Sequence, residues 1–448
     1  MFVAEPDDPL DTPRAQDQGP VAVERGDPAL AADLAQRARA ETDPVRSLRL
    51  LLAAAVVAPD RAEYRLAVAG VVLGQIEPRR LNHGDLGGGG LVRYAELSTS
   101  GAWLVVDRDD GGQLWQLRAY GPVFRMTSIL HSPIVSASAG EDPVRTRVVI
   151  SHHGGVDLWE LAPTASRSTG RRTRIADPAQ AVAVSHRADT AVTVTGTTAT
   201  VWDLGTGGAE AIAVLPYDQP VMSVRLPPTT ELLVTATHPG GGITIDRIDR
   251  RNNTSVRQVL AGHRGPVAAA TVSGDGTIAA AVAEDGELTV WVTAAAAAPW
   301  ATVEPSGVVS TGLTGPARLW LSSDGSFAFV AGPSAPPTVW SLADPTTPVR
   351  LHDLAIGTDP AVPAMFTEDG RTLITIDRRN TVTVWDTAAL VDTLTDPVQR
   401  ACQAAAMTEP AWREIIADPA VAYPCPAQPG LPTIDVQTGP ATPPSDTR

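Results

Sequence analysis

Residues 261–291 read AGHRGPVAAATVSGDGTIAAAVAEDGELTVW, and the fold can be inferred from their pattern. Its Asp275-Gly276 pair separates two apolar runs. Such a pair favours a tight hairpin, because glycine accepts a positive φ and the aspartate side chain can hydrogen-bond its own backbone. From Glu287 to Trp291 the residues alternate with a period of two, which is the period of a strand. The stretch therefore predicts short antiparallel strands, the last of which ends at a tryptophan.

That tryptophan recurs along the chain at intervals of 43 to 49 residues. The series is Trp115, Trp159, Trp202, Trp291, Trp340 and Trp385. Its one gap of 89 residues contains Ile245, which stands in Thr244-Ile245-Asp246 as Trp202 stands in Val201-Trp202-Asp203. The count is therefore seven units. A unit of this length is typical of a four-stranded sheet that cannot bury both faces alone and stacks with its neighbours into a ring.

The sequence thus predicts an all-β fold, a seven-bladed β-propeller. A stack of helical repeats is the alternative, and the Asp-Gly hairpins and the short segments rich in Thr and Val disfavour it. The unit at residues 261–291 resembles the WD40 family, in which a Gly-His dipeptide opens the blade. The resemblance implies that His263, Asp285 and Trp291 hydrogen-bond within the blade, while the Ser/Thr position of that network reads Ala281.

The chain divides into five parts by composition. We expect a disordered N-terminus at 1–25, a helical segment at 26–61, the seven-bladed WD40 propeller at 62–395, a C-terminal helical extension at 396–426 and a disordered Pro-rich tail at 427–448. Within the propeller, the apolar run from Leu66 to Leu73 is expected to be the strand that closes the ring by completing the last blade.

Both ends of the chain carry a second resemblance. Asp27 to Ala35 is similar to the helical segment that precedes the propeller in bacterial WD40 proteins attached to STAND-class signalling NTPases. Asp396-Pro397, Ala401-Cys402, Trp412 and Cys425-Pro426 resemble the closing segment of the same proteins. The resemblance implies the sensor region of such a protein, without its nucleotide-binding module.

The charge of the chain limits its partners. The sequence contains no lysine, and its 35 basic residues are all arginine. A P-loop lysine and a Schiff-base lysine are therefore excluded. Fifty acidic residues give a net charge of −15, which disfavours a nucleic-acid partner because such binding depends on neutralising phosphates. Two short clusters, at Arg171, Arg172 and Arg174 and at Arg247, Arg250 and Arg251, are expected to be solvated loop charge.

The compartment is expected to be cytoplasmic, because no export signal stands out. No run of 18 apolar residues occurs, so membrane insertion is not expected. The two cysteines, Cys402 and Cys425, flank a short helical segment and leave two possibilities open. They are a disulfide, which would indicate an extracytoplasmic compartment, or two free thiols in a reducing cytoplasm.

No catalytic, cofactor or metal site is predicted. His152-His153 is expected to form a turn, because adjacent strand residues point to opposite faces and no further ligands accompany the pair. A propeller enzyme of the lactonase or hydrolase kind is the alternative, and it needs inward polar residues on several blades. The first strands of the units, such as Val182–Val184 and Val267–Ala270, are apolar. We therefore predict a monomeric, non-catalytic platform that binds a protein or peptide.

The connections between blades are the expected binding surface. In three units the Asp-Gly aspartate precedes the tryptophan by 16 residues, so the variation in repeat length falls in the connections. Loops on a rigid scaffold commonly carry binding residues. Trp300 lies in such a connection and is predicted to contact the partner. The alternative is that Trp300 packs under its own loop.

Overall fold

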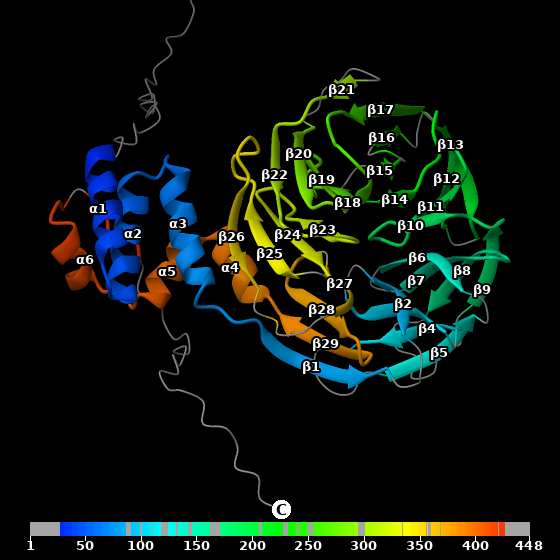
Figure 1. Cartoon of the computed structure of the whole chain (residues 1–448), viewed down its shortest axis with the longest axis horizontal. Helices are drawn as coiled ribbons and strands as arrows, with labels where there is room; N and C mark the ends of the chain where they lie inside the picture. The colour runs from blue at the N-terminus through cyan, green and yellow to red at the C-terminus, as the bar shows by residue number, and fades with distance from the viewer. Residues whose placement is uncertain are drawn as a thin grey trace, which may run out of the picture.

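The computed structural model is a ring of β-sheets with a helical bundle at one side (Figure 1). The structure describes residues 27–86, 91–98, 101–109, 111–117, 124–130, 133–141, 146–161, 171–205, 208–226, 232–238, 240, 242–249, 254–293, 301–333, 335–354, 356, 360–367, 369–419 and 421–425. The segments predicted to be disordered, 1–25 and 427–448, lie outside the described residues.

Seven sheets form the ring, so the predicted seven-bladed propeller is confirmed. Blade 1 contains β2 (Val92–Leu97), β3 (Trp103–Arg108), β4 (Gly111–Gln116) and β5 (Phe124–Leu130). Blade 2 contains β6 (Ile134–Glu141), β7 (Thr146–His152), β8 (Gly155–Leu161) and β9 (Arg171–Ala176). Blade 3 contains β10 (Ala181–Val184), β11 (Thr190–Thr195), β12 (Thr198–Asp203) and β13 (Glu210–Pro216).

The remaining blades continue in chain order. Blade 4 contains β14 (Ser223–Arg225), β15 (Leu232–Thr237), β16 (Ile243–Asp249) and β17 (Thr254–Leu260), and β21 (Ala301–Val303) is added to β17 in parallel. Blade 5 contains β18 (Val267–Val272), β19 (Ile278–Ala283), β20 (Glu287–Val292) and β22 (Gly307–Ser310). Blade 6 contains β23 (Arg318–Leu321), β24 (Phe327–Gly332), β25 (Ala335–Ser341) and β26 (Val349–Asp353). Blade 7 contains β27 (Pro360–Phe366), β28 (Thr372–Asp377), β29 (Thr381–Asp386) and β1 (Arg79–Asp85).

The Asp-Gly pairs form the predicted hairpins. Gly276 has a φ of +73°, and Asp275 accepts hydrogen bonds from the Ser273 hydroxyl at 2.6 Å and from the Thr277 amide at 3.0 Å. The same arrangement recurs in blades 6 and 7, where Gly325 and Gly370 have φ values of +69° and +67°. Each aspartate therefore joins the two sides of its turn, and a side chain larger than glycine's would be strained at the next position.

The ring closes through an N-terminal strand, as expected, but the predicted strand is wrong. β1 pairs antiparallel with β29 from Arg79 opposite Asp386 to Asp85 opposite Thr381. The run from Leu66 to Leu73 lies instead in α3 (Ala62–Leu73). Its buried side chains recur every four residues, at Tyr64, Val68 and Val72, which is helical spacing. The helical segment therefore extends to Leu73, twelve residues beyond the predicted boundary at 61.

In the part of the chain that the structure describes, five further helices flank the ring. They are α1 (Pro28–Ala40), α2 (Pro44–Val57), α4 (Ala388–Thr395), α5 (Pro397–Ala404) and α6 (Glu409–Ile415). An Asp-Pro pair starts α1, α2 and α5, because in each the aspartate side chain accepts a backbone N–H of the first turn and proline occupies the first helical position.

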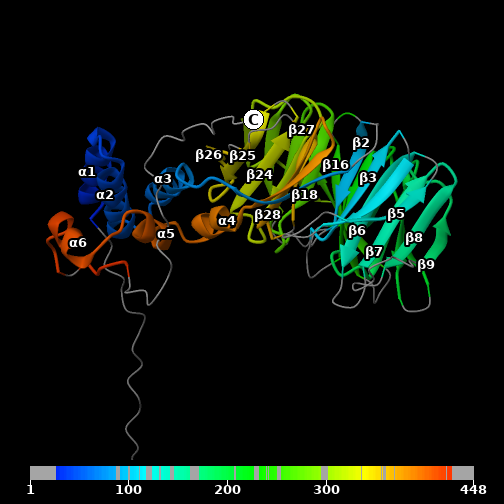
Figure 2. The ribbon, with the colours of Figure 1, turned by 90° about the horizontal axis from the view of Figure 1, so that it is seen from below.

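The N-terminal helices and the C-terminal helices pack into one bundle. Leu34 and Leu52 from the N-terminal helices share a core with Ala401 and Trp412 from α5 and α6, and all four are fully buried. Arg49 on α2 donates from Nε to the carbonyl of Ala405 at 3.0 Å. Figure 2 shows α3, α5 and α4 between the outer helices and the ring, where α3 contacts β26.

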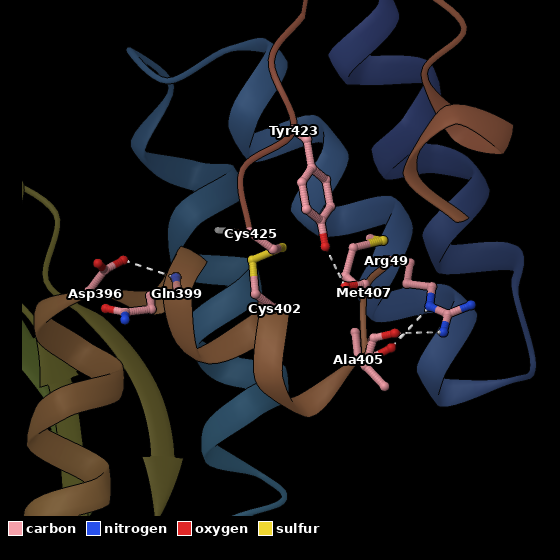
Figure 3. The surroundings of a disulfide bond; sticks show 9 residues. Arg49, Asp396, Gln399, Cys402, Ala405, Met407, Tyr423 and Cys425 are labelled. Carbon is pink, nitrogen blue, oxygen red and sulfur yellow. Dashed lines mark hydrogen bonds between the residues drawn. A yellow bond between two sulfur atoms is a disulfide. The ribbon is translucent and has the colours of Figure 1, made fainter. Parts of the chain in front are cut away.

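A disulfide joins Cys402 on α5 to Cys425 after α6, with their Cα atoms 5.6 Å apart (Figure 3). The Tyr423 hydroxyl donates to the Met407 carbonyl at 2.6 Å beside it. Of the two possibilities for these cysteines, the structure therefore has the bonded one. Among the described helices, none is long and apolar enough to span a membrane.

Candidate binding site on the propeller axis

The residues of the tryptophan series each lie on the third strand of their blade. Trp115 lies on β4, Trp159 on β8, Trp202 on β12, Ile245 on β16, Trp291 on β20, Trp340 on β25 and Trp385 on β29. Most of the indoles bond within their own blade. Trp202 donates to Thr193 at 2.9 Å, Trp340 to Thr338 at 2.8 Å, Trp385 to Thr375 at 3.0 Å and Trp115 to Gln113 at 3.2 Å. The bonds of Trp202 and Trp385 join neighbouring strands, whereas those of Trp340 and Trp115 lie within one strand. None of these indole N–H groups is left for a ligand.

The residues of blade 5 form a different network from the one that the resemblance implies. His263 Nδ1 lies 2.9 Å from the Thr289 hydroxyl, and the Trp291 indole donates to the Ala261 carbonyl at 2.9 Å. Asp285 is exposed and accepts from the Glu287 amide at 3.1 Å. Burial lowers the pKa of His263, so its imidazole is neutral at neutral pH. Thr289, two residues before the tryptophan, thus supplies the hydroxyl that is missing at Ala281.

The arginine cluster at 171–174 is not loop charge, which corrects the prediction. Arg172 and Arg174 lie on β9 and donate from Nε to Asp157 at 2.8 and 2.9 Å. His152 Nε2 lies 2.8 Å from the same carboxylate. Burial alone would raise the pKa of Asp157, but these partners outweigh it and lower that pKa. The cluster ties β9 to β7 and β8. Of the pair predicted to form a turn, His153 does so together with Gly154, whereas His152 is the last residue of β7.

A second charge cluster joins blades 3 and 4. Arg257 donates from Nε to Asp246 at 2.7 Å and from Nη1 to the Pro216 carbonyl at 2.7 Å. The Tyr217 hydroxyl donates to the other oxygen of Asp246 at 2.8 Å. Asp246 is fully buried, and this burial raises its pKa. Since both carboxylate oxygens have partners, this cluster stabilises the contact between two blades.

The propeller axis is lined by one edge strand from each blade, namely β2, β6, β10, β14, β18, β23 and β27 (Figure 1). A cavity of ≈ 190 Å³ lies among five of them, β2, β14, β18, β23 and β27. Most of its walls are apolar, including Leu226, Ala269 and Phe366. Two of its strands contribute arginines and a third contributes an acid. The axis is therefore the place where side chains from separate blades converge.

Three charged residues meet in this cavity, and we call them the axial triad: Glu96 on β2, Arg225 on β14 and Arg318 on β23. Arg225 Nη1 donates to Glu96 Oε1 at 2.6 Å, and Arg318 Nη1 lies 3.1 Å from Glu96 Oε2. Arg318 Nη2 also donates to the Ala95 carbonyl at 2.9 Å. The axial triad thus connects blades 1, 4 and 6 across the ring.

The electrostatics of the axial triad keep the Glu96 carboxyl group ionised. Burial of Glu96 opposes its ionisation, but Arg225 and Arg318 outweigh this effect and lower its pKa. Glu96 in turn raises the pKa of Arg225. Burial and the neighbouring Glu96 raise the pKa of Tyr94 to about 12, so that hydroxyl stays neutral. A general base works best with a pKa near the operating pH, and Glu96 is shifted away from it. The arrangement is suited to ion pairing.

Within the described ranges, no group of three or more His, Cys, Asp and Glu side chains could hold a metal ion. Trp300, which is predicted to contact the partner, lies outside the described residues. The disulfide of Cys402 and Cys425 lies in the helical bundle and not on the axis.

The axial triad was not predicted from the sequence. Its members are separated by 129 residues or more from Glu96 to Arg225 and to Arg318, so no local motif unites them. One signal could have found them. Arg225 in Ser223-Val224-Arg225 and Arg318 at the start of β23 place a charge in the first strand of a blade, whereas the first strands β10, β18 and β27 carry no charged residue.

Comparison with known proteins supports the fold. No protein-family model and no curated protein matches the chain. Among solved structures, the WD40 repeats of RRP9 are similar with a TM-score of 0.51 and 11% identity, over 69% of this chain and 97% of that one. U3-55K is similar with a TM-score of 0.50 and 10% identity, over 69% and 98% of the two chains. At such identities the likeness shows the seven-bladed fold of WD40 repeat structures and no more.

Proposed function

We propose that this chain is a non-catalytic platform that binds a protein or peptide partner through its propeller, as a sensor module in bacterial signalling. The observation that carries the proposal is the axial cavity, whose acid is tied to two arginines from other blades. Such a site offers fixed charge and apolar walls for recognition, and its acid is a poor proton acceptor.

The rest of the architecture supports a rigid scaffold. The ring is closed by β1 on β29, and both ends of the chain meet in one bundle that a disulfide secures. A closed ring leaves few free strand edges, so loops and the axis are the surfaces open to a partner. Charged residues across the axis further fix the relative positions of blades 1, 4 and 6.

The signalling context rests on the resemblance of both chain ends to WD40 proteins attached to STAND-class NTPases. The two resembling stretches, near Asp27 and near Asp396, both start helices of the bundle. The disulfide favours an oxidising compartment over the cytoplasm, since thiols in the cytoplasm are kept reduced. Alkylation of the folded protein without reductant, followed by mass spectrometry, tests this: two alkylated cysteines would contradict it.

The proposed function is tested by affinity capture with the full chain. Immobilised protein is exposed to an extract of the source cells, and heat-unfolded protein serves as the matched control. We expect a partner that binds saturably to the folded chain and does not bind the unfolded control. The mass of this partner should be the same before and after binding. Failure to capture any saturable partner, together with hydrolysis of lactone or ester substrates by the purified chain, would favour an enzyme.

A further inference from the structure

We propose that the axial cavity binds one carboxylate group of the partner, held by the guanidinium groups of Arg225 and Arg318. This inference rests on the proposed function, because it names the chemistry that the propeller axis recognises. The carboxylate is that of an acidic side chain or of a chain terminus, and the experiment below separates these two sources.

The charge of the cavity favours an anion. Among the described residues that line it, Glu96 is the one acid and Arg225 and Arg318 are the two bases, so one positive charge is left over. The chain as a whole carries −15. The sign at the axis is therefore opposite to that of the molecule. An anion there is held by direct contacts and not by the overall field, since that field repels it.

The hydrogen-bond donors of Arg225 identify where the anion binds. Its Nη1 bonds Glu96, and no other nitrogen of this guanidinium has a partner among the described residues. Its side chain is 42% exposed, whereas that of Arg318 is 27% exposed and bonds both Glu96 and the Ala95 carbonyl. Arg225 thus keeps N–H groups available, and a guanidinium binds a carboxylate through two parallel hydrogen bonds.

The size and walls of the cavity select the anion. A cavity of ≈ 190 Å³ is comparable to an engineered cavity of about 150 Å³ that holds a benzene molecule, so one side chain fits. A phosphate would bring a charge of about −1.5 to −2 beside Glu96, which exceeds the single positive charge available. A carboxylate brings −1. Its methylene groups would contact apolar residues such as Leu226 and Phe366.

Four blocked peptides serve as probes in calorimetric titrations of the full chain. Acetyl-Gly-Leu-Glu-Leu-Gly-amide is compared with the same peptide carrying Gln, and acetyl-Gly-Leu-Leu with a free carboxylate is compared with its amide. We expect at least a tenfold preference for the carboxylate member of one pair, which corresponds to about 1.4 kcal/mol. The pair that shows it identifies the source of the carboxylate. No preference in either pair, or no binding by any peptide, would overturn the inference.

One variant and one matched control locate the effect. R225M is expected to reduce the preference to less than twofold. The matched control is R93M, because Arg93 also lies on an inner strand, is 44% exposed and pairs with Asp107 at 3.2 Å, but does not line the cavity. R93M is expected to keep the full preference. Equal behaviour of R225M and R93M would refute the assignment.

A third variant distinguishes a loss of the binding site from a loss of folding. E96Q removes the carboxylate that competes for Arg225 and Arg318, so the carboxylate peptide should bind several-fold more tightly. A loss of folding cannot mimic a gain in affinity, and weaker binding by E96Q would contradict the proposal. The partner obtained by affinity capture distinguishes a failure of this inference from a failure of the proposed function. If it binds wild type and R225M alike, the platform function stands and this inference fails.

Discussion

Replacing both cysteines with alanine removes the covalent link between α5 and the segment after α6. The disulfide closes a loop with a sequence separation of 23 residues. In the chain-entropy description, a loop of this length stabilises the folded state by about 3.4 kcal/mol at 25 °C. The bundle has its own buried core, so we expect C402A/C425A to destabilise the bundle and to leave the propeller almost unchanged.

The assay is thermal unfolding followed by circular dichroism at 222 nm, where the helices of the bundle dominate the signal. A unit of about 60–100 residues loses roughly 4–8 °C in Tm per kcal/mol, so the helical transition should fall by more than about 10 °C. Reductant added to the wild-type protein is the matched control, and it should give the same fall without any substitution. An unchanged helical transition in both samples would show that the disulfide does not stabilise the bundle.

Three further outcomes are expected. Trp300→Ala should abolish binding of the captured partner with an unchanged Tm, and a drop of several degrees with binding retained per folded molecule would assign Trp300 to packing. Asp157→Asn should lower the free energy of unfolding by about 2 kcal/mol at pH 7, through the lost hydrogen bonds to Arg172 and Arg174. Since the pKa of Asp157 is lowered in the folded protein, this difference should be present above the ordinary Asp pKa of about 3.9 and disappear as the pH falls through the folded value; denaturant titrations at several pH values measure it, and a constant difference would contradict the assignment. Deletion of residues 1–86 removes β1 and exposes the edge of β29, so light scattering should show aggregation, whereas deletion of 1–26 should leave a soluble, cooperatively unfolding protein.

The propeller could be predicted from the sequence because each blade repeats the same short sequence pattern. Every tryptophan of the series lies on a third strand, and Ile245 occupies the same place on β16. The Asp-Gly turns were predictable for the same reason, since a turn with positive φ constrains residues that are adjacent in the chain.

The closing strand could not be located from apolar patterning. β1 is polar, and Arg79, Arg80 and His83 are exposed, because an outermost strand has little to cover it. The apolar run at 66–73 is buried as a helix between α2, α5 and the ring. Patterning identifies what is buried but not which neighbour buries it.

The axial triad could not be predicted from the sequence because its residues lie far apart in the chain. Glu96 and Arg225 are 129 residues apart, and only ring closure brings β2 and β14 to one axis. The same holds for the bundle, in which α2 receives α5 and α6 from the opposite end of the chain. Such pairings depend on tertiary geometry, which no local spacing encodes.

The proposed function requires that the propeller bind a partner without changing it covalently. The most direct measurement is a calorimetric titration of the captured partner into the full chain, followed by intact mass analysis of both proteins. We predict saturable binding of one partner per propeller with both masses unchanged. A covalent change in the partner, or the absence of saturable binding, would contradict the proposed function.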